Sequence, residues 1–191
     1  MLELLSIFFS AAILNNFVLA RFLGICPFLG VSKQTRSALG IGIAVTFVML
    51  FASLIIYPVF HFILVPLGLE FLKIVSFILI IASLVQFIEM YMSRYQKVLH
   101  KAFGIYLPLI TTNCAILAVT LLLVLKEYNF IESLVFAFGA GAGFTFALVI
   151  MSGIREKLNE SKVPEPLRGV PIALIIAGIL ALAFSGFAGV L

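Results

Sequence analysis

The sequence predicts an all-α integral membrane protein with six transmembrane helices, and three observations support this prediction. Of the 191 residues, 64% are hydrophobic and 10% are charged, and the mean hydropathy is +1.30. Soluble domains carry about 25% charged residues, so this composition excludes an ordinary soluble enzyme. Apolar runs of roughly 20 residues, the length that crosses a hydrocarbon core, fill most of the chain. The third observation is that basic residues collect in alternate loops.

The apolar runs define the six expected spans. They cover residues 2–31, 38–59, 70–92, 103–126, 131–153 and 169–190. Because these spans leave no room for a soluble domain, residues 1–191 are predicted to form one membrane domain. The first span lacks a basic leading region and is longer than the apolar core of a signal peptide, so we expect it to be retained.

The orientation follows from the basic residues. Nine of the twelve lysines and arginines lie in the first, third and fifth loops: Lys33, Arg36, Arg94, Lys97, Lys101, Arg155, Lys157, Lys162 and Arg168. Short cytoplasmic loops are enriched in basic residues, so these loops are predicted to face the cytoplasm and both termini to face outside. The same bias accounts for the net charge of +4, so nucleic-acid binding is not expected.

The order of the spans also predicts a 3+3 inverted repeat, with halves at about residues 1–96 and 97–191. Each half begins with an interrupted span that carries one cysteine, followed by a glycine-containing span and a third apolar span. Cys26 and Cys114, the two cysteines of the chain, therefore occupy matching places.

Helices 1 and 4 of this arrangement are predicted to be interrupted at the membrane midplane. As one helix, residues 2–31 would extend about 45 Å, well beyond the hydrocarbon thickness. Glycine and proline at Gly24, Pro27 and Gly30 predict a break near Cys26. The second break is predicted where Pro108 opens the helix and polar residues satisfy freed backbone groups: Thr111, Thr112 and Asn113. Irregular backbone at this depth needs protein or a polar cavity around it, so both thiols are expected to face inward.

Two cysteines at matching breaks favour a role as ligands. A lone buried cysteine often acts as a small hydrophobe, and a disulfide would not explain a separate helix break at each thiol. Thiolates suit iron–sulfur clusters, zinc or copper(I). A closed four-cysteine site needs two more ligands than this chain offers, so a partner subunit or a second copy is expected to supply them.

Other features have simpler interpretations. His61 and His100 lie in or near loops on opposite sides, which excludes a haem held between them. The run Gly139–Gly143 follows no strand, so it predicts close helix packing rather than phosphate binding. Arg21 is expected either to lie near the cluster or to pair with a carboxylate of a neighbouring helix. Glu89 fits an interfacial or capping position.

Two segments carry a family resemblance. Residues 14–33 (LNNFVLARFLGICPFLGVSK) and 103–115 (FGIYLPLITTNCA) resemble the RnfA/NqrE family, and in particular its RnfA form, which belongs to the Rnf complex. Residues 85–90, 153–157 and 163–169 add to the match, which covers essentially the whole chain. The related NqrE protein of the sodium-pumping NADH:quinone reductase shares much of this pattern.

The resemblance implies a subunit of an ion-translocating ferredoxin:NAD⁺ oxidoreductase in the bacterial inner membrane, with both termini on the periplasmic side. In that family, the RnfA protein pairs with a homologous six-helix protein of inverted orientation, RnfE. Their cysteines hold one [2Fe–2S] cluster, whose ligands here would be Cys26 and Cys114. Electron flow is coupled to Na⁺ or H⁺ movement, and the flavin and nucleotide sites belong to other Rnf subunits.

The residues taken without the resemblance leave other classes open. A small inverted-repeat secondary transporter, with broken helices that bind substrate at the midplane, fits the interrupted spans nearly as well as a redox conduit does. A structural membrane scaffold with inert cysteines is a third interpretation. The presence or absence of iron separates the redox conduit from the transporter.

Overall fold

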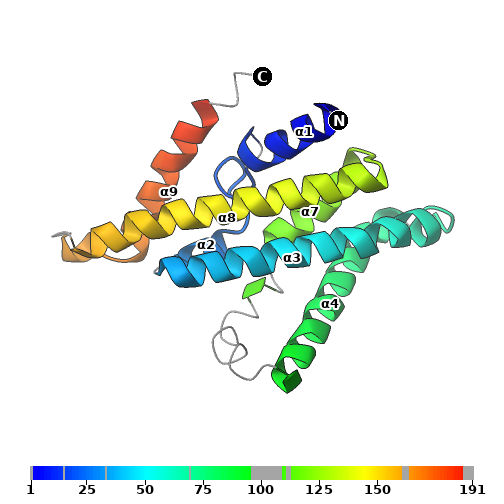
Figure 1. The fold of residues 1–191 in the computed structure, drawn as a ribbon, viewed down its shortest axis with the longest axis horizontal. Helices are drawn as coiled ribbons and strands as arrows, with labels where there is room; N and C mark the ends of the chain where they lie inside the picture. Colours follow the sequence, from blue (N-terminus) through cyan, green and yellow to red (C-terminus); the bar gives the residue numbers. More distant parts are fainter. Residues whose placement is uncertain are drawn as a thin grey trace.

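A computed structural model gives the fold for residues 2–14, 16–32, 34–68, 70–95, 109–110, 113–160 and 164–186 (Figure 1). Its elements are α1 (Leu2–Phe9), η1 (Ser10–Leu14), α2 (Ile25–Val31), α3 (Thr35–Val59), η2 (Phe60–Leu64), η3 (Glu70–Leu72), α4 (Lys73–Tyr95), α7 (Cys114–Leu125), α8 (Phe130–Glu160), η4 (Glu165–Leu167) and α9 (Val170–Ser185). Within these ranges every regular element is helical, so the all-α prediction is confirmed there.

Three of these helices are long and apolar enough to cross a membrane: Thr35–Leu64, Lys73–Tyr91 and Phe130–Leu158. Three shorter apolar helices, Glu3–Leu14, Cys114–Leu125 and Val170–Ser185, fall in the other expected spans. The first of the short helices ends because the expected span is interrupted, as the sequence predicts. The fourth expected span includes residues 103–108 and 111–112, which lie outside the described residues, as does most of the predicted hinge at 95–100.

The antiparallel pair α3 and α8 forms the centre of the molecule. Gly42 of α3 faces Thr145 of α8, and Gly141 of α8 faces Thr46 of α3. A Cβ atom at either glycine would lie 2.6 Å from the facing threonine methyl group, and the two threonine hydroxyl oxygens are 3.3 Å apart. Small residues at these points let the two backbones approach closely.

The Gly139–Gly143 run packs helices together, as predicted. Gly139 lies against the backbone of Phe8 in α1, and Gly143 lies against the backbone of Ala12 in η1. The ring of Phe8 also stacks on Phe138 of α8, with centroids 5.9 Å apart. The run therefore serves α1 and η1 on one side of α8, while Gly141 serves α3.

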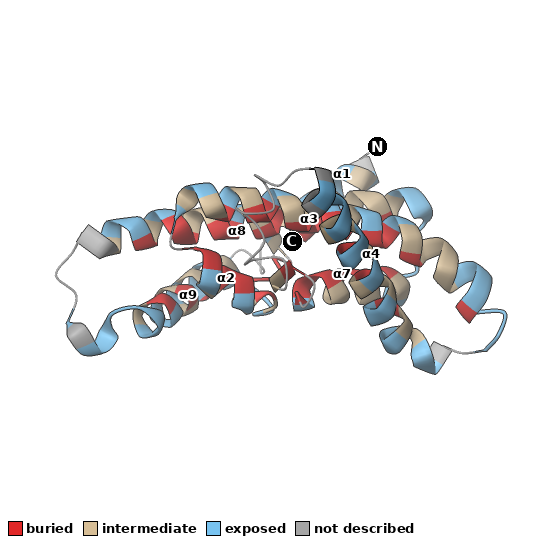
Figure 2. Cartoon of the chain, turned by 90° about the horizontal axis from the view of Figure 1, so that it is seen from below, coloured by how far each residue is buried: buried red, intermediate tan, exposed pale blue. Residues whose placement is uncertain are grey.

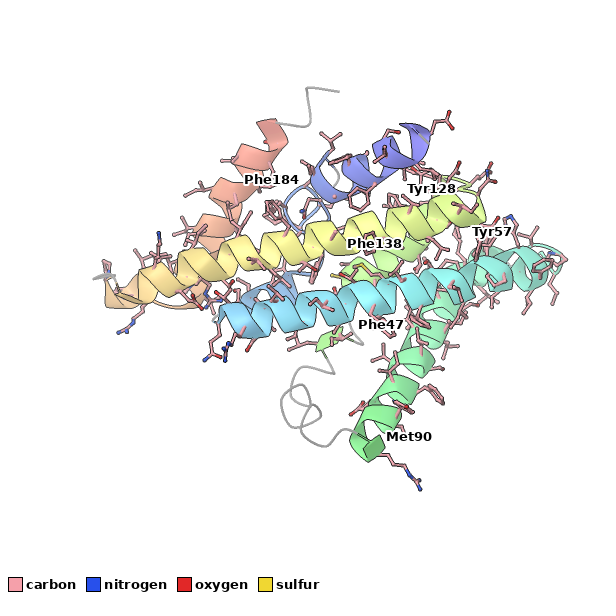
Figure 3. The ribbon with its side chains drawn as sticks, viewed as in Figure 1. Phe47, Tyr57, Met90, Tyr128, Phe138 and Phe184 are labelled. Carbon is pink, nitrogen blue, oxygen red and sulfur yellow. The ribbon has the colours of Figure 1, made fainter. Side chains whose placement is uncertain are left out.

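Burial is concentrated where α3 and α8 face each other, and α4 is largely exposed (Figure 2). Along α4, Leu79, Phe87 and Met90 are all exposed, and Met90 lies near its free end (Figure 3). Phe47 of α3 is similarly exposed beside the central pair. Apolar surface of this extent is typical of a chain surrounded by lipid or by other membrane subunits.

Candidate functional site

The first break lies slightly earlier in the chain than the sequence indicates. Regular helix stops at Leu14, and α2 starts at Ile25, so Cys26 is the second residue of the helix that follows the break. Pro27 lies in the first turn of α2, where a proline removes no helix hydrogen bond. The proline therefore helps to start a helix at Cys26 rather than to interrupt one.

A buried asparagine holds this break together. Asn16 is 1% exposed, and its amide Nδ2 donates to the carbonyl oxygen of Gly143 in α8 at 2.9 Å. Its Oδ1 accepts hydrogen bonds from the backbone N–H groups of Val18 at 3.1 Å and Leu19 at 3.4 Å. The side chain thus satisfies backbone donors that the interrupted helix leaves free, and it fixes the break to α8.

The second break ends at Asn113, the N-cap residue of α7. Its Oδ1 accepts from the N–H of Ala115 at 3.0 Å, which confirms that this polar residue satisfies a freed backbone group. The side chain is 4% exposed, yet its amide Nδ2 has no hydrogen-bond partner in the part of the chain that the structure describes. Pro108, Thr111 and Thr112 lie outside that part.

The two breaks meet at Gly24 and Cys114. The N–H of Gly24 donates to the Sγ atom of Cys114 at 2.9 Å, across 90 residues of sequence. Gly24 is only two residues before Cys26, so Cys114 lies against the segment that carries the other cysteine. Each cysteine lies in the first turn of its helix, which is the electropositive end and favours an anionic ligand.

Both thiols are free and exposed. The expectation that they face inward is wrong for this chain alone, because each helix begins at the surface where the two breaks meet. The described residues hold no cluster of three or more His, Cys, Asp or Glu side chains that could bind a metal ion. The two exposed thiols are therefore the metal-binding groups that this surface offers.

The other sequence-predicted residues lie elsewhere. Arg21 is exposed in the turn after Asn16, and Glu89 is partly exposed on α4. His61 stacks on Tyr57 with ring centroids 4.9 Å apart, near the end of α3 in Figure 3. His100 lies outside the described residues.

Comparison with known proteins identifies the family of this membrane chain. A family described as "Rnf-Nqr subunit, membrane protein" matches residues 4–191. The chain belongs to the Rnf-Nqr family. This result confirms the resemblance seen in the sequence, and it confirms a membrane protein.

Three relatives, each named as the A subunit of its complex, show how similar this Rnf-Nqr chain is to known proteins. It is 56% identical over 188 residues to that of the Na(+)-translocating ferredoxin:NAD(+) oxidoreductase complex of Acetobacterium woodii, with 98% of each chain covered. It is 53% identical over 189 residues to that of the ion-translocating oxidoreductase complex of Syntrophotalea carbinolica, covering 99% of this chain and 98% of the relative. The corresponding protein of Aliivibrio salmonicida is 49% identical over 189 residues, with the same coverage.

Sequence reasoning missed the role of Gly24 in this Rnf-Nqr protein, because it treated the residue only as a helix breaker. Gly24 has φ +79°, and a Cβ there would lie 2.8 Å from the ring of Phe144 and 3.2 Å from Ala115. Phe144 is fully buried and cannot move aside without disturbing the core. Gly24 thus combines a left-handed backbone with close packing, and both keep its N–H against Cys114.

We expect Gly24→Ala to separate the two breaks. The side chain adds strain of about 1–2 kcal/mol at a left-handed residue, in addition to the clash with Phe144. The measurement is the melting temperature of the purified protein in detergent, together with the alkylation rate of Cys114. Gly30→Ala is the matched control, because its Cβ would meet only Leu109 at 3.9 Å. Equal effects of the two substitutions would contradict the packing argument.

Proposed function

We propose that this chain is the RnfA component of an ion-translocating ferredoxin:NAD⁺ oxidoreductase (Rnf) complex and conducts electrons through the membrane. The observation that carries the proposal is the contact between Gly24 and the Cys114 sulfur, which joins the two cysteine-bearing breaks. The names of relatives at 49–56% identity over nearly the whole chain support the complex and its activity.

Within this proposal, Cys26 and Cys114 are two of the four ligands of a [2Fe–2S] cluster. The donor set fits the group, because two soft thiols lie in helix first turns and are open for a second protein to complete the site. The N–H bond to Cys114 and the unpaired amide of Asn113 are donors of the kind that stabilise negatively charged cluster sulfur. A homologous six-helix partner of the RnfE type would supply the other two cysteines.

We further propose a six-span, 3+3 inverted repeat in the bacterial inner membrane, with both termini on the periplasmic side. Two features support the repeat. The Gly42–Thr145 and Gly141–Thr46 contacts are reciprocal across the antiparallel α3–α8 pair. Each half also has a cysteine in the first turn of the helix after a break. Charge placement in the loops supports the orientation.

A bound cluster would supply one-electron redox chemistry, and this chain would provide its binding and its electrostatics. Two thiolates hold it, and the Gly24 N–H opposes the negative charge on sulfur. An added electron at low dielectric is poorly screened, so a cation nearby is stabilised. This effect gives electron transfer a physical means of driving Na⁺ or H⁺ movement.

Thiol footprinting of the purified complex tests the ligand assignment. Cys26 and Cys114 are exposed on this chain, so they are alkylated readily unless a cluster or a partner protects them. We expect little modification of either residue in the untreated complex and full modification after iron is removed with a chelator. Mass spectrometry reads the result directly, because the chain has no other cysteine. Equal, rapid modification before and after chelation would reject the redox role and favour the transporter or scaffold.

A further inference from the structure

Arg155 is a buried cation near the end of α8, and its contacts lie on the helix that carries Cys26 and just beyond it. The residue is 8% exposed. Its Nη1 atom donates to the carbonyl oxygen of Leu29 at 2.7 Å and to the hydroxyl oxygen of Ser32 at 2.8 Å. Burying a guanidinium group is costly unless hydrogen bonds compensate, so this pair of contacts calls for an explanation beyond a surface charge.

The helix α2 needs support from outside itself. It has seven residues, and its N-cap Gly24 provides no side-chain cap. Isolated helices shorter than about 12 residues are marginal, because few internal hydrogen bonds offset the cost of forming the first turn. Leu29 is among the last four residues of α2, whose carbonyl groups lack partners within the helix. Arg155 satisfies one of these carbonyls and places a positive charge at the negative end of the helix.

The next residue of α8 holds the other side of the same connection. Glu156 accepts a hydrogen bond through Oε1 from the backbone N–H of Thr35 at 2.8 Å. Thr35 is the first residue of α3, and its N–H is one of the donors that a helix start leaves free. Arg155 and Glu156 together therefore clamp the link between α2 and α3 from both ends.

We propose that Arg155 is a positioning residue for Cys26, fixing the short helix so that its thiol stays in register with Cys114. Cys26 lies three residues before Leu29, which is less than one helical turn of about 5.4 Å. A clamp on Leu29 thus fixes the height and rotation of the cysteine. The inference rests on the proposed function, because the register matters only if the two thiols share a ligand.

The test compares Arg155→Leu with Arg36→Leu in the purified complex. Arg36 is exposed in the first turn of α3 and carries the same charge on the same predicted side of the membrane. For Arg155→Leu we expect cluster loss to a chelator to accelerate roughly 10- to 100-fold, as for other residues that orient metal ligands. Hydrogen exchange is expected to rise in the Ile25–Val31 peptide and to stay unchanged in Cys114–Leu125. Arg36→Leu is expected to match the unmodified complex.

Two further variants grade the effect. Arg155→Lys retains a cation and one donor, so we expect it to restore much of the cluster stability. Ser32→Ala removes one acceptor and leaves the Leu29 contact, so we expect a smaller change in the same direction, even if Arg155→Leu fails to assemble. Chelator resistance and α2 exchange that are equal in all these variants would overturn the inference. Free alkylation of Cys26 and Cys114 in the untreated complex would instead overturn the proposed function.

Discussion

Replacement of either Cys26 or Cys114 by serine is expected to remove the proposed cluster from the complex. Each thiol would supply one of four ligands, and the serine oxygen is a harder, poorer ligand for iron than a thiolate. We expect the iron content to fall by about two atoms per complex, as a [2Fe–2S] cluster requires. The electron paramagnetic resonance signal of the reduced cluster is expected to disappear, while signals of other subunits persist.

The two cysteine variants are expected to behave alike, because each removes half of what this chain contributes. Gly30→Ala serves as the control within α2, since its side chain would be exposed and make one ordinary contact. It is expected to retain the full signal. A double serine variant that still contains the same iron and the same signal would reject the ligand assignment and leave only the family membership.

The features that the sequence predicts well are those written in short, local patterns. Hydropathy over roughly 20 residues identifies the membrane class, and the glycine run at 139–143 predicts close helix packing. The interruption of the first span follows from its length alone. Its limits do not, because Asn16 ends one helix through a contact with Gly143, which lies 127 residues away.

The candidate site shows the same division. The cysteines and their helix breaks are visible in the sequence, as is the N-cap residue Asn113. The contact of Gly24 with Cys114 is not, because no local pattern reports which carbonyl, thiol or ring approaches across 90 residues. Arg155 resembles an ordinary cytoplasmic charge until its contacts with α2 are seen. The inward-facing prediction failed for a related reason: one sequence does not contain the partner surface.

Gly143→Ala is expected to destabilise the protein strongly, although alanine is the better helix former. A Cβ atom at Gly143 would overlap the backbone of Ala12, which a side-chain rotation cannot relieve. Any displacement of α8 from η1 also weakens the hydrogen bond from Asn16 to the Gly143 carbonyl. Overpacking costs about 1–3 kcal/mol, and an unsatisfied buried amide costs a similar amount. We expect a clear fall in the melting temperature in detergent and faster proteolysis around residues 14–24.

The matched control makes the sign of the effect informative. Gly153 lies on the same helix, is exposed, and would have nothing within 4 Å of an added Cβ atom. Gly153→Ala is therefore expected to be stabilising by about 0.5–1 kcal/mol, the usual gain from replacing glycine inside a helix. The same substitution thus has opposite signs at two positions of α8. If both raised the melting temperature, the close approach of η1 to α8 would be refuted, together with the contact that fixes the first break.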